Sequence, residues 1–257
     1  MLLAFLQSTY EAARGPRQVG QRGPRATRAL PHGSTPVERR WLPGTSQLHT
    51  PAARGRGRRV LLLPWQPLLL LAASQIPALE AETGCRVGWH PVDGHALRAL
   101  RGRDPFLGDP PSGQYDWTYR RTDAEAWADY YGIPFREPLD HDLDFDLLVR
   151  VATVAKRLGA AAAYGWRLCA AVYASAAWPL DEALCLRLAD EIRLPANEFH
   201  SMLRDTETGR LMDETARDAH ARGAFGVPTF FVGGRMFWGN DRIVLLRHYL
   251  RRLVGGL

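Results

Sequence analysis

The sequence predicts an α/β fold whose strands come from two stretches of chain separated by helices alone. Residues 60–92 read as strand, helix and strand, and residues 225–250 read as a β-hairpin followed by a helix. Between them, residues 94–205 show helical patterns only. The two strand-bearing stretches are therefore expected to form one fold with an all-helical insertion between them.

Composition separates residues 1–59 from the rest of the chain. Of the 33 Lys and Arg and 27 Asp and Glu, residues 1–59 hold 11 Arg and 2 Glu, which leaves 22 basic and 25 acidic residues elsewhere. We predict that residues 1–59 are a disordered Arg-rich extension, with the composition of a GC-rich stretch read in the wrong frame. The mildly acidic remainder gives no support to nucleic-acid binding, and no apolar run is long enough to span a membrane.

The first strand-bearing stretch begins at Val60. Residues 60–63 are short and apolar, as expected for a buried parallel strand. The helix that follows should be kinked or split by Pro77 and should end at Gly84, a favoured C-cap. Residues 85–92 alternate with period two and predict the second strand, so this stretch is typical of a right-handed βαβ unit. The apolar positions at helical spacing are Leu68, Ala72, Ile76 and Leu79.

The middle of the chain reads as a series of helices with recognisable ends. Asp144 and Asp181 are favoured N-caps, whereas Gly159 and Gly223 stop helices. We expect helices over residues 123–131, 144–158, 160–176, 181–193, 197–203 and 206–222.

Residues 225–242 are the most informative stretch. Apolar and aromatic runs on either side of Gly233-Gly234 predict two strands joined by a tight turn, because glycine accepts the positive φ that such turns need. Pro228 has no N–H to give to a strand ladder, so its presence indicates an edge strand, a bulge or a cis bond. We prefer the cis bond, which would leave the backbone of Val227 open to a peptide-like ligand. A hairpin without a ligand is the alternative.

Asn240 and Asp241 precede the last apolar run of the chain. Both residue types are favoured N-caps, so we expect a helix to begin here, and its free N–H groups would suit an anionic ligand. As a simpler alternative, the two residues serve only as caps.

A specific family resemblance lies in the same stretch. Residues 225–242 read Phe-Gly-Val-Pro-Thr-Phe-Phe-Val-Gly-Gly-Arg-Met-Phe-Trp-Gly-Asn-Asp-Arg, which resembles the C-terminal signature of the 2-hydroxychromene-2-carboxylate isomerases. These are relatives of kappa-class glutathione transferases and of DsbA-like thioredoxin-fold proteins. The similarity extends back through residues 172–174 and 178–182 to near Leu71. It implies a thioredoxin-like fold, with residues 60–93 and 206–257 as the thioredoxin-like domain and residues 94–205 as the helical insertion.

The resemblance also implies glutathione as cofactor and a small aromatic-derived substrate, and it allows a homodimer. Val227 would pair with the cysteinyl backbone of glutathione. Asn240 and Asp241 would hold its γ-glutamyl end, with the aspartate meeting the ammonium group. The positions implied for cofactor binding are Val227, Pro228, Trp238, Gly239, Asn240 and Asp241.

The catalytic position departs from the family pattern. In the family that the chain resembles, a Ser-Pro pair opens the first helix, and the serine holds the glutathione sulfur as a thiolate. The pattern places this proline at Pro67 and the serine at Gln66, and residues 60–73 contain no Ser, Thr, Tyr or Cys. Gln66 is therefore the candidate catalytic residue, but an amide can donate an N–H and cannot transfer a proton.

The remaining polar residues suggest no redox or metal centre. The three cysteines include no C-x-x-C motif, which argues against a dithiol centre and fits small buried residues in a reducing cytoplasm. The eight histidines form no metal-binding motif, and the Asp-rich run at residues 140–146 lacks the glycine and glutamate of a calcium loop. Three tryptophans, Trp89, Trp127 and Trp178, are read as core residues in preference to substrate wall.

Several functions remain open at this point. The first is a glutathione-dependent isomerase of aromatic compound degradation, in which the thiolate adds to and leaves a double bond. The second is a catalytically impaired glutathione-binding protein, consistent with Gln66, and a kappa-class glutathione transferase-like enzyme is close to both. A DsbA-like oxidoreductase is a further candidate, against which the missing cysteine pair argues.

Overall fold

The strands and helices follow the order that the sequence predicts. The computed structural model describes residues 60–62, 67–102, 117–138 and 143–254, so the extension at residues 1–59 lies outside the described residues. The strands are β1 (Val60–Leu62), β2 (Val87–Trp89), β3 (Thr229–Val232) and β4 (Arg235–Trp238). The helices are α3 (Pro67–Ser74), α4 (Ile76–Thr83), α5 (Gly94–Arg101), α6 (Trp117–Tyr131), α7 (Phe145–Arg157), α8 (Ala161–Tyr173), α9 (Glu182–Glu191), α10 (Ala196–Leu203), α11 (Thr206–Ala221) and α12 (Ile243–Val254).

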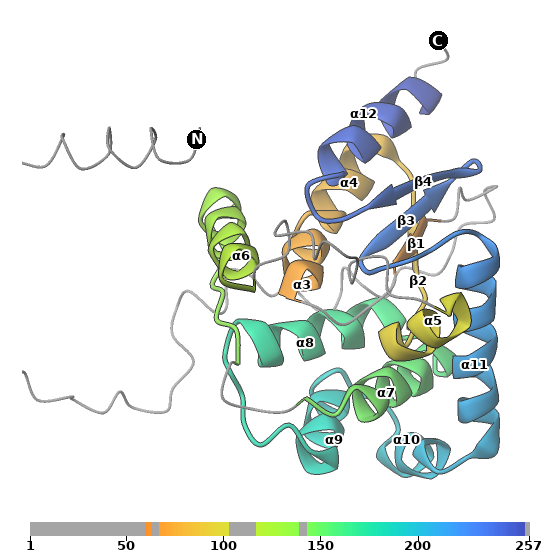
Figure 1. Cartoon of the computed structure of the whole chain (residues 1–257). Helices are drawn as coiled ribbons and strands as arrows, with labels where there is room; N and C mark the ends of the chain where they lie inside the picture. The colour runs from red at the N-terminus through yellow and green to blue at the C-terminus, as the bar shows by residue number, and fades with distance from the viewer. Residues whose placement is uncertain (1–59, 63–66, 103–116, 139–142, 255–257) are drawn as a thin grey trace, which may run out of the picture. The chain divides into compact units, whose positions relative to one another are not determined.

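The two strand-bearing stretches meet, as expected. β1 and β2 pair in parallel with Val60 opposite Val87, and β3 and β4 form an antiparallel hairpin with Thr229 opposite Trp238. β1 lies beside β3, which brings the strands of the first stretch to the hairpin (Figure 1). β2 is shorter than the predicted 85–92 at both ends. At its start, the N–H of Cys85 donates to the hydroxyl of Thr83 at the end of α4 and not to a neighbouring strand.

Helix ends in the first stretch agree with the sequence. α3 stops at Ser74 and α4 begins at Ile76, so Pro77 lies in the first turn of a new helix, where a missing N–H costs nothing. Gly84 ends α4 with φ at 64°, a backbone conformation that suits glycine.

Within the described residues, the elements between Gly94 and Asp205 are all helices. α5 was not predicted: Asp93 caps it by accepting a hydrogen bond from the N–H of His95 at 2.7 Å. α6 begins earlier than the predicted residue 123, and α8 ends earlier than the predicted residue 176. None of the described helices combines the length and the apolar run that a membrane span requires.

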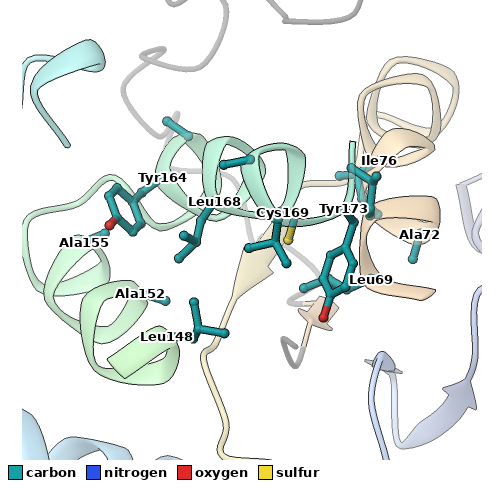
Figure 2. Packing of buried hydrophobic residues seen from close by; sticks show 14 of the residues in the cluster. Leu69, Ala72, Ile76, Leu148, Ala152, Ala155, Tyr164, Leu168, Cys169 and Tyr173 are labelled. Atoms are coloured by element: carbon teal, nitrogen blue, oxygen red, sulfur yellow. The ribbon is translucent and has the colours of Figure 1, made fainter. Parts of the chain in front are cut away.

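One hydrophobic cluster joins the helices to the strand-bearing stretches. Figure 2 shows α8 at its centre, with Tyr164 and Leu168 towards α7 and Tyr173 towards α3. Phe230 of β3 and Leu246 of α12 belong to the same cluster. Side chains from the predicted domain and from its predicted insertion thus share a core, and the boundaries at residues 94 and 205 stay a prediction.

Aromatic residues and cysteines divide between core and surface. All three cysteines, Cys85, Cys169 and Cys185, are free and buried, as predicted for small apolar residues. Trp89 and Trp127 are half-buried against the main cluster. Trp178 is 45% exposed, so its assignment to the core was wrong: it stands at the exposed loop between α8 and α9.

Burial of Cys185 predicts a loss of stability in alkali. Burial, its main cause, raises the pKa of this thiol from 9.0 to about 11. Between about pH 9 and pH 11, the folded chain therefore keeps a thiol proton that the unfolded chain loses. Across this range, the free energy of unfolding falls by about 2–3 kcal/mol because of this group. The free energy of unfolding, measured with urea near pH 9 and near pH 11, should fall less in Cys185→Ser than in the wild type. An equal fall in both proteins would contradict the assignment of this loss of stability to Cys185.

Candidate functional site

The two parts of the predicted cofactor site lie together at one end of the β3–β4 hairpin. The Val227–Pro228 peptide bond immediately precedes β3 and is cis, as interpreted from the sequence. The N–H of Gly239 donates to the C=O of Pro228 at 2.9 Å, one residue beyond the Thr229–Trp238 pair. The hairpin therefore holds Val227 and Pro228 beside the turn that begins at Gly239.

Val227 offers its backbone to this site and not its side chain. Val227 as a whole residue is 5% exposed, and its side chain lies in a second cluster with residues of α5 and α11. Neither its N–H nor its C=O forms a hydrogen bond with another described residue. Unpaired backbone groups next to a strand can accept a peptide as an added strand. The members of this second cluster are Val92, Leu97, Ala216, Ala219, Ala224, Val227 and Phe231.

An aromatic wall stands beside Val227. The rings of Phe225 and Trp238 are 4.9 Å apart between centroids, at an interplanar angle of 55°. Trp238 lies so close to Gly226 that a Cβ added there would be 2.5 Å from its indole Nε1. Thr229 supports this turn by donating its hydroxyl to the C=O of Gly226 at 2.6 Å. Gly226 is thus the residue that lets the indole pack against the backbone before the cis-proline.

The last helix begins later than predicted. α12 starts at Ile243, and residues 239–242 form a turn in which the C=O of Asn240 accepts the N–H of Ile243 at 3.2 Å. The first helical hydrogen bond to the turn runs from the N–H of Leu246 to the C=O of Arg242 at 2.8 Å. The expectation that the helix begins at Asn240 and Asp241 was therefore wrong, because an i to i+3 turn occupies this position.

The side chains of this turn do not act as helix caps. Among the described residues, neither the side chain of Asn240 nor that of Asp241 accepts a hydrogen bond from a backbone N–H of α12. Asn240 is 2% exposed, and its Nδ2 has no acceptor within the described part of the chain. A buried donor without an acceptor costs free energy, which an oxygen of a ligand or of a water could relieve. Asp241 is exposed and lies 3.3 Å from Nε of Arg242.

Helix α6 contributes a second carboxylate that sequence reasoning missed. Burial and then the negative charge of Asp241 raise the pKa of Asp123, which a hydrogen bond from Trp127 partly offsets. Burial also raises the pKa of Tyr131 to about 12, and the charge of Arg247 opposes this rise. Asp241 therefore faces α6, and its carboxylate and that of Asp123 repel each other. No local pattern could have placed Asp123 here, since its position depends on α6 packing against α3.

The described part of the structure does not include the predicted catalytic residue. Gln66 lies outside the described residues, one position before α3 begins at Pro67. Of the predicted site residues, those within the described chain are brought together: Val227, Pro228, Trp238, Gly239, Asn240 and Asp241. Within the same part of the chain, no three His, Cys, Asp or Glu side chains gather as metal ligands would.

Known proteins share this architecture. Residues 70–251 match the model of the DSBA-like thioredoxin domain family. The 2-hydroxychromene-2-carboxylate isomerase of Pseudomonas putida is 30% identical over 190 residues, which cover 73% of this chain and 90% of the relative. A solved 2-hydroxychromene-2-carboxylate isomerase superposes with a TM-score of 0.66 at 26% identity, over 76% of this chain and 95% of the other.

A more distant structure shares the fold alone. The cytosolic disulfide reductase DsbM from Pseudomonas aeruginosa, solved with GSH, gives a TM-score of 0.52 at 18% identity. The match covers 77% of this chain and 97% of DsbM.

Proposed function

Because the chain belongs to the DSBA-like thioredoxin domain family, we propose that it is a glutathione-dependent isomerase that resembles 2-hydroxychromene-2-carboxylate isomerase. The observation that carries this proposal is the nearness of two groups that lack hydrogen-bond partners among the described residues, the backbone of Val227 and the buried Nδ2 of Asn240. A peptide with a charged amino-acid end could form hydrogen bonds with the backbone of Val227 and with the amide of Asn240. The similarity to two isomerases at 26–30% identity supports the reaction class. A neighbour that shares the fold at 18% identity was solved with GSH.

The residues of the turn suit the γ-glutamyl end of glutathione. Asn240 would donate Nδ2 to its carboxylate, which would satisfy the buried donor. Asp241 would accept from its ammonium group. The repulsion between Asp241 and Asp123 favours the same occupant, because a cation near both carboxylates would relieve it.

The backbone and aromatic wall would place the reactive end of the cofactor. Val227 would pair with the cysteinyl unit through its N–H and C=O, which directs the sulfur away from the turn. Phe225 and Trp238 would border that position with apolar surface and exclude water from the reacting double bond. Bound glutathione supplies a thiol that adds reversibly to a conjugated double bond, so that the bond can rotate or the ring can reclose.

The side chain of Gln66 limits the rate of isomerisation that we expect. Its amide could donate an N–H to sulfur, but it neither ionises nor relays a proton. We therefore propose slow isomerisation of a small aromatic-derived acid in a reducing, cytoplasmic setting. The second candidate, a glutathione-binding protein without turnover, is favoured by the same glutamine.

Conversion of 2-hydroxychromene-2-carboxylate tests the proposal. Its absorbance should change with time when the protein and glutathione are both present, and the rate should fall to the uncatalysed rate when glutathione is omitted. Conversion that is equally fast without glutathione would contradict the proposed role of the cofactor. Glutathione binding without any conversion would establish the second candidate instead.

A further inference from the structure

One guanidinium group beside the aromatic wall has no described carboxylate partner. Arg101 is the last residue of α5, and its Cζ lies 5.4 Å from the ring centroid of Phe225. Within the described residues, the side chain of Arg101 contacts this ring, and no Asp or Glu carboxylate lies within ion-pair distance of its guanidinium. A guanidinium held on a ring face keeps its in-plane N–H groups available for a planar acceptor.

The packing of α5 fixes where this guanidinium stands. Leu97 is 2% exposed and lies in the cluster that also buries Val227. Arg101 follows Leu97 by four residues, so both occupy the same face of the helix. The guanidinium therefore lies over Phe225, two residues before Val227, on the side of the site that Phe225 and Trp238 line.

Other arginines on aromatic rings differ from Arg101 in partner or in place. Arg222 lies over Phe231 at 4.4 Å, but Asp218 is 3.7 Å from it and neutralises its charge. Arg235 lies over Tyr249 at 4.7 Å, at the turn end of the hairpin, opposite to the end that holds Pro228. Arg101 thus combines a positive charge without a described counterion with a place at the candidate site.

We propose that Arg101 is a specificity-determining residue that binds the carboxylate of an aromatic substrate. This inference rests on the proposed function. The substrate ring packs on the wall formed by Phe225 and Trp238, and its carboxylate accepts two N–H groups of the guanidinium. The glycine end of glutathione also carries a carboxylate, so the test distinguishes a substrate carboxylate from the carboxylate of glutathione.

Chromone-2-carboxylate and chromone-2-carboxamide are matched aromatic probes that differ by the charged group. Titration calorimetry of the full-length protein, saturated with glutathione, should show that the carboxylate binds about ten- to a hundredfold more tightly than the amide. Arg101→Gln should abolish this preference and leave the affinity for glutathione unchanged. Arg235→Gln, the matched control, should retain the preference.

Three outcomes would overturn the inference. The first is equal binding of both probes by the wild type, and the second is a preference for the carboxylate probe that persists in Arg101→Gln. The third is a loss of glutathione affinity in Arg101→Gln, which would show that the arginine binds glutathione and not the substrate. Because the probes do not isomerise, this result is independent of the turnover that tests the proposed function.

Discussion

Replacing Gly226 by Ala should lower the free energy of unfolding by about 1–3 kcal/mol and displace the aromatic wall. The new Cβ would lie 2.5 Å from Nε1 and 3.1 Å from Cε2 of Trp238, and a rigid ring cannot yield as the end of a flexible chain can. Trp238 also contacts Phe225 and pairs with Thr229, so its displacement disturbs the wall and the hairpin together. Glutathione binding should weaken in the same variant, because Gly239 follows Trp238 directly.

A matched control separates this clash from a general effect of adding a methyl group. Gly209 lies inside α11, and an added Cβ there meets nothing within 4 Å. Gly209→Ala should therefore be neutral or stabilising by up to about 1 kcal/mol, since alanine favours helix. Urea unfolding compares the two variants, and an unchanged midpoint for Gly226→Ala would show that the indole does not lie against this glycine.

The Gln66→Ser variant should gain isomerase activity by about 10²- to 10³-fold, the usual contribution of one donor to a developing negative charge. A hydroxyl at the start of the first helix can hydrogen-bond the glutathione sulfur, and the partial positive charge of a helix N-terminus favours the thiolate. Ultraviolet absorbance should then show a larger thiolate fraction of bound glutathione at neutral pH.

Two comparisons make this result specific. Gln66→Ala removes the amide without adding a hydroxyl, so it should not raise the thiolate fraction. A variant whose residues 60–70 are rebuilt to the family pattern controls for the neighbouring residues. If the rebuilt variant binds glutathione and shows neither thiolate nor isomerisation, the assignment of this position is wrong.

Elements with a strong local signal could be predicted from the sequence. Gly233 and Gly234 adopt φ values of 54° and 80°, as a tight hairpin requires. Asp144 and Asp181 accept hydrogen bonds from the N–H groups three residues on, at 2.9 and 2.8 Å, so the cap rule located both helix starts. Pro228 indicated the candidate site because a residue without an N–H is out of place in a strand.

Features that depend on tertiary packing could not be predicted in this way. Asn240 and Asp241 fit both a helix cap and a turn, and the hydrogen bond from Ile243 to the C=O of Asn240 decides between them. The charge of Asp241 acts on Asp123 of α6, and no local pattern encodes that these two residues are near each other. Arg101 reaches Phe225 from α5, an eight-residue helix that was not predicted from the sequence.

Glutathione titration by calorimetry tests most directly the proposal that the turn at residues 239–242 binds glutathione. The wild type should bind glutathione, and Asp241→Ala should weaken binding by about 1–3 kcal/mol, because the γ-glutamyl ammonium loses its carboxylate partner. Asp213→Ala is the control, since Asp213 is an exposed aspartate of α11 that lies 3.6 Å from Arg217, and its loss should leave the affinity unchanged. Equal affinity of the wild type and Asp241→Ala would contradict the account.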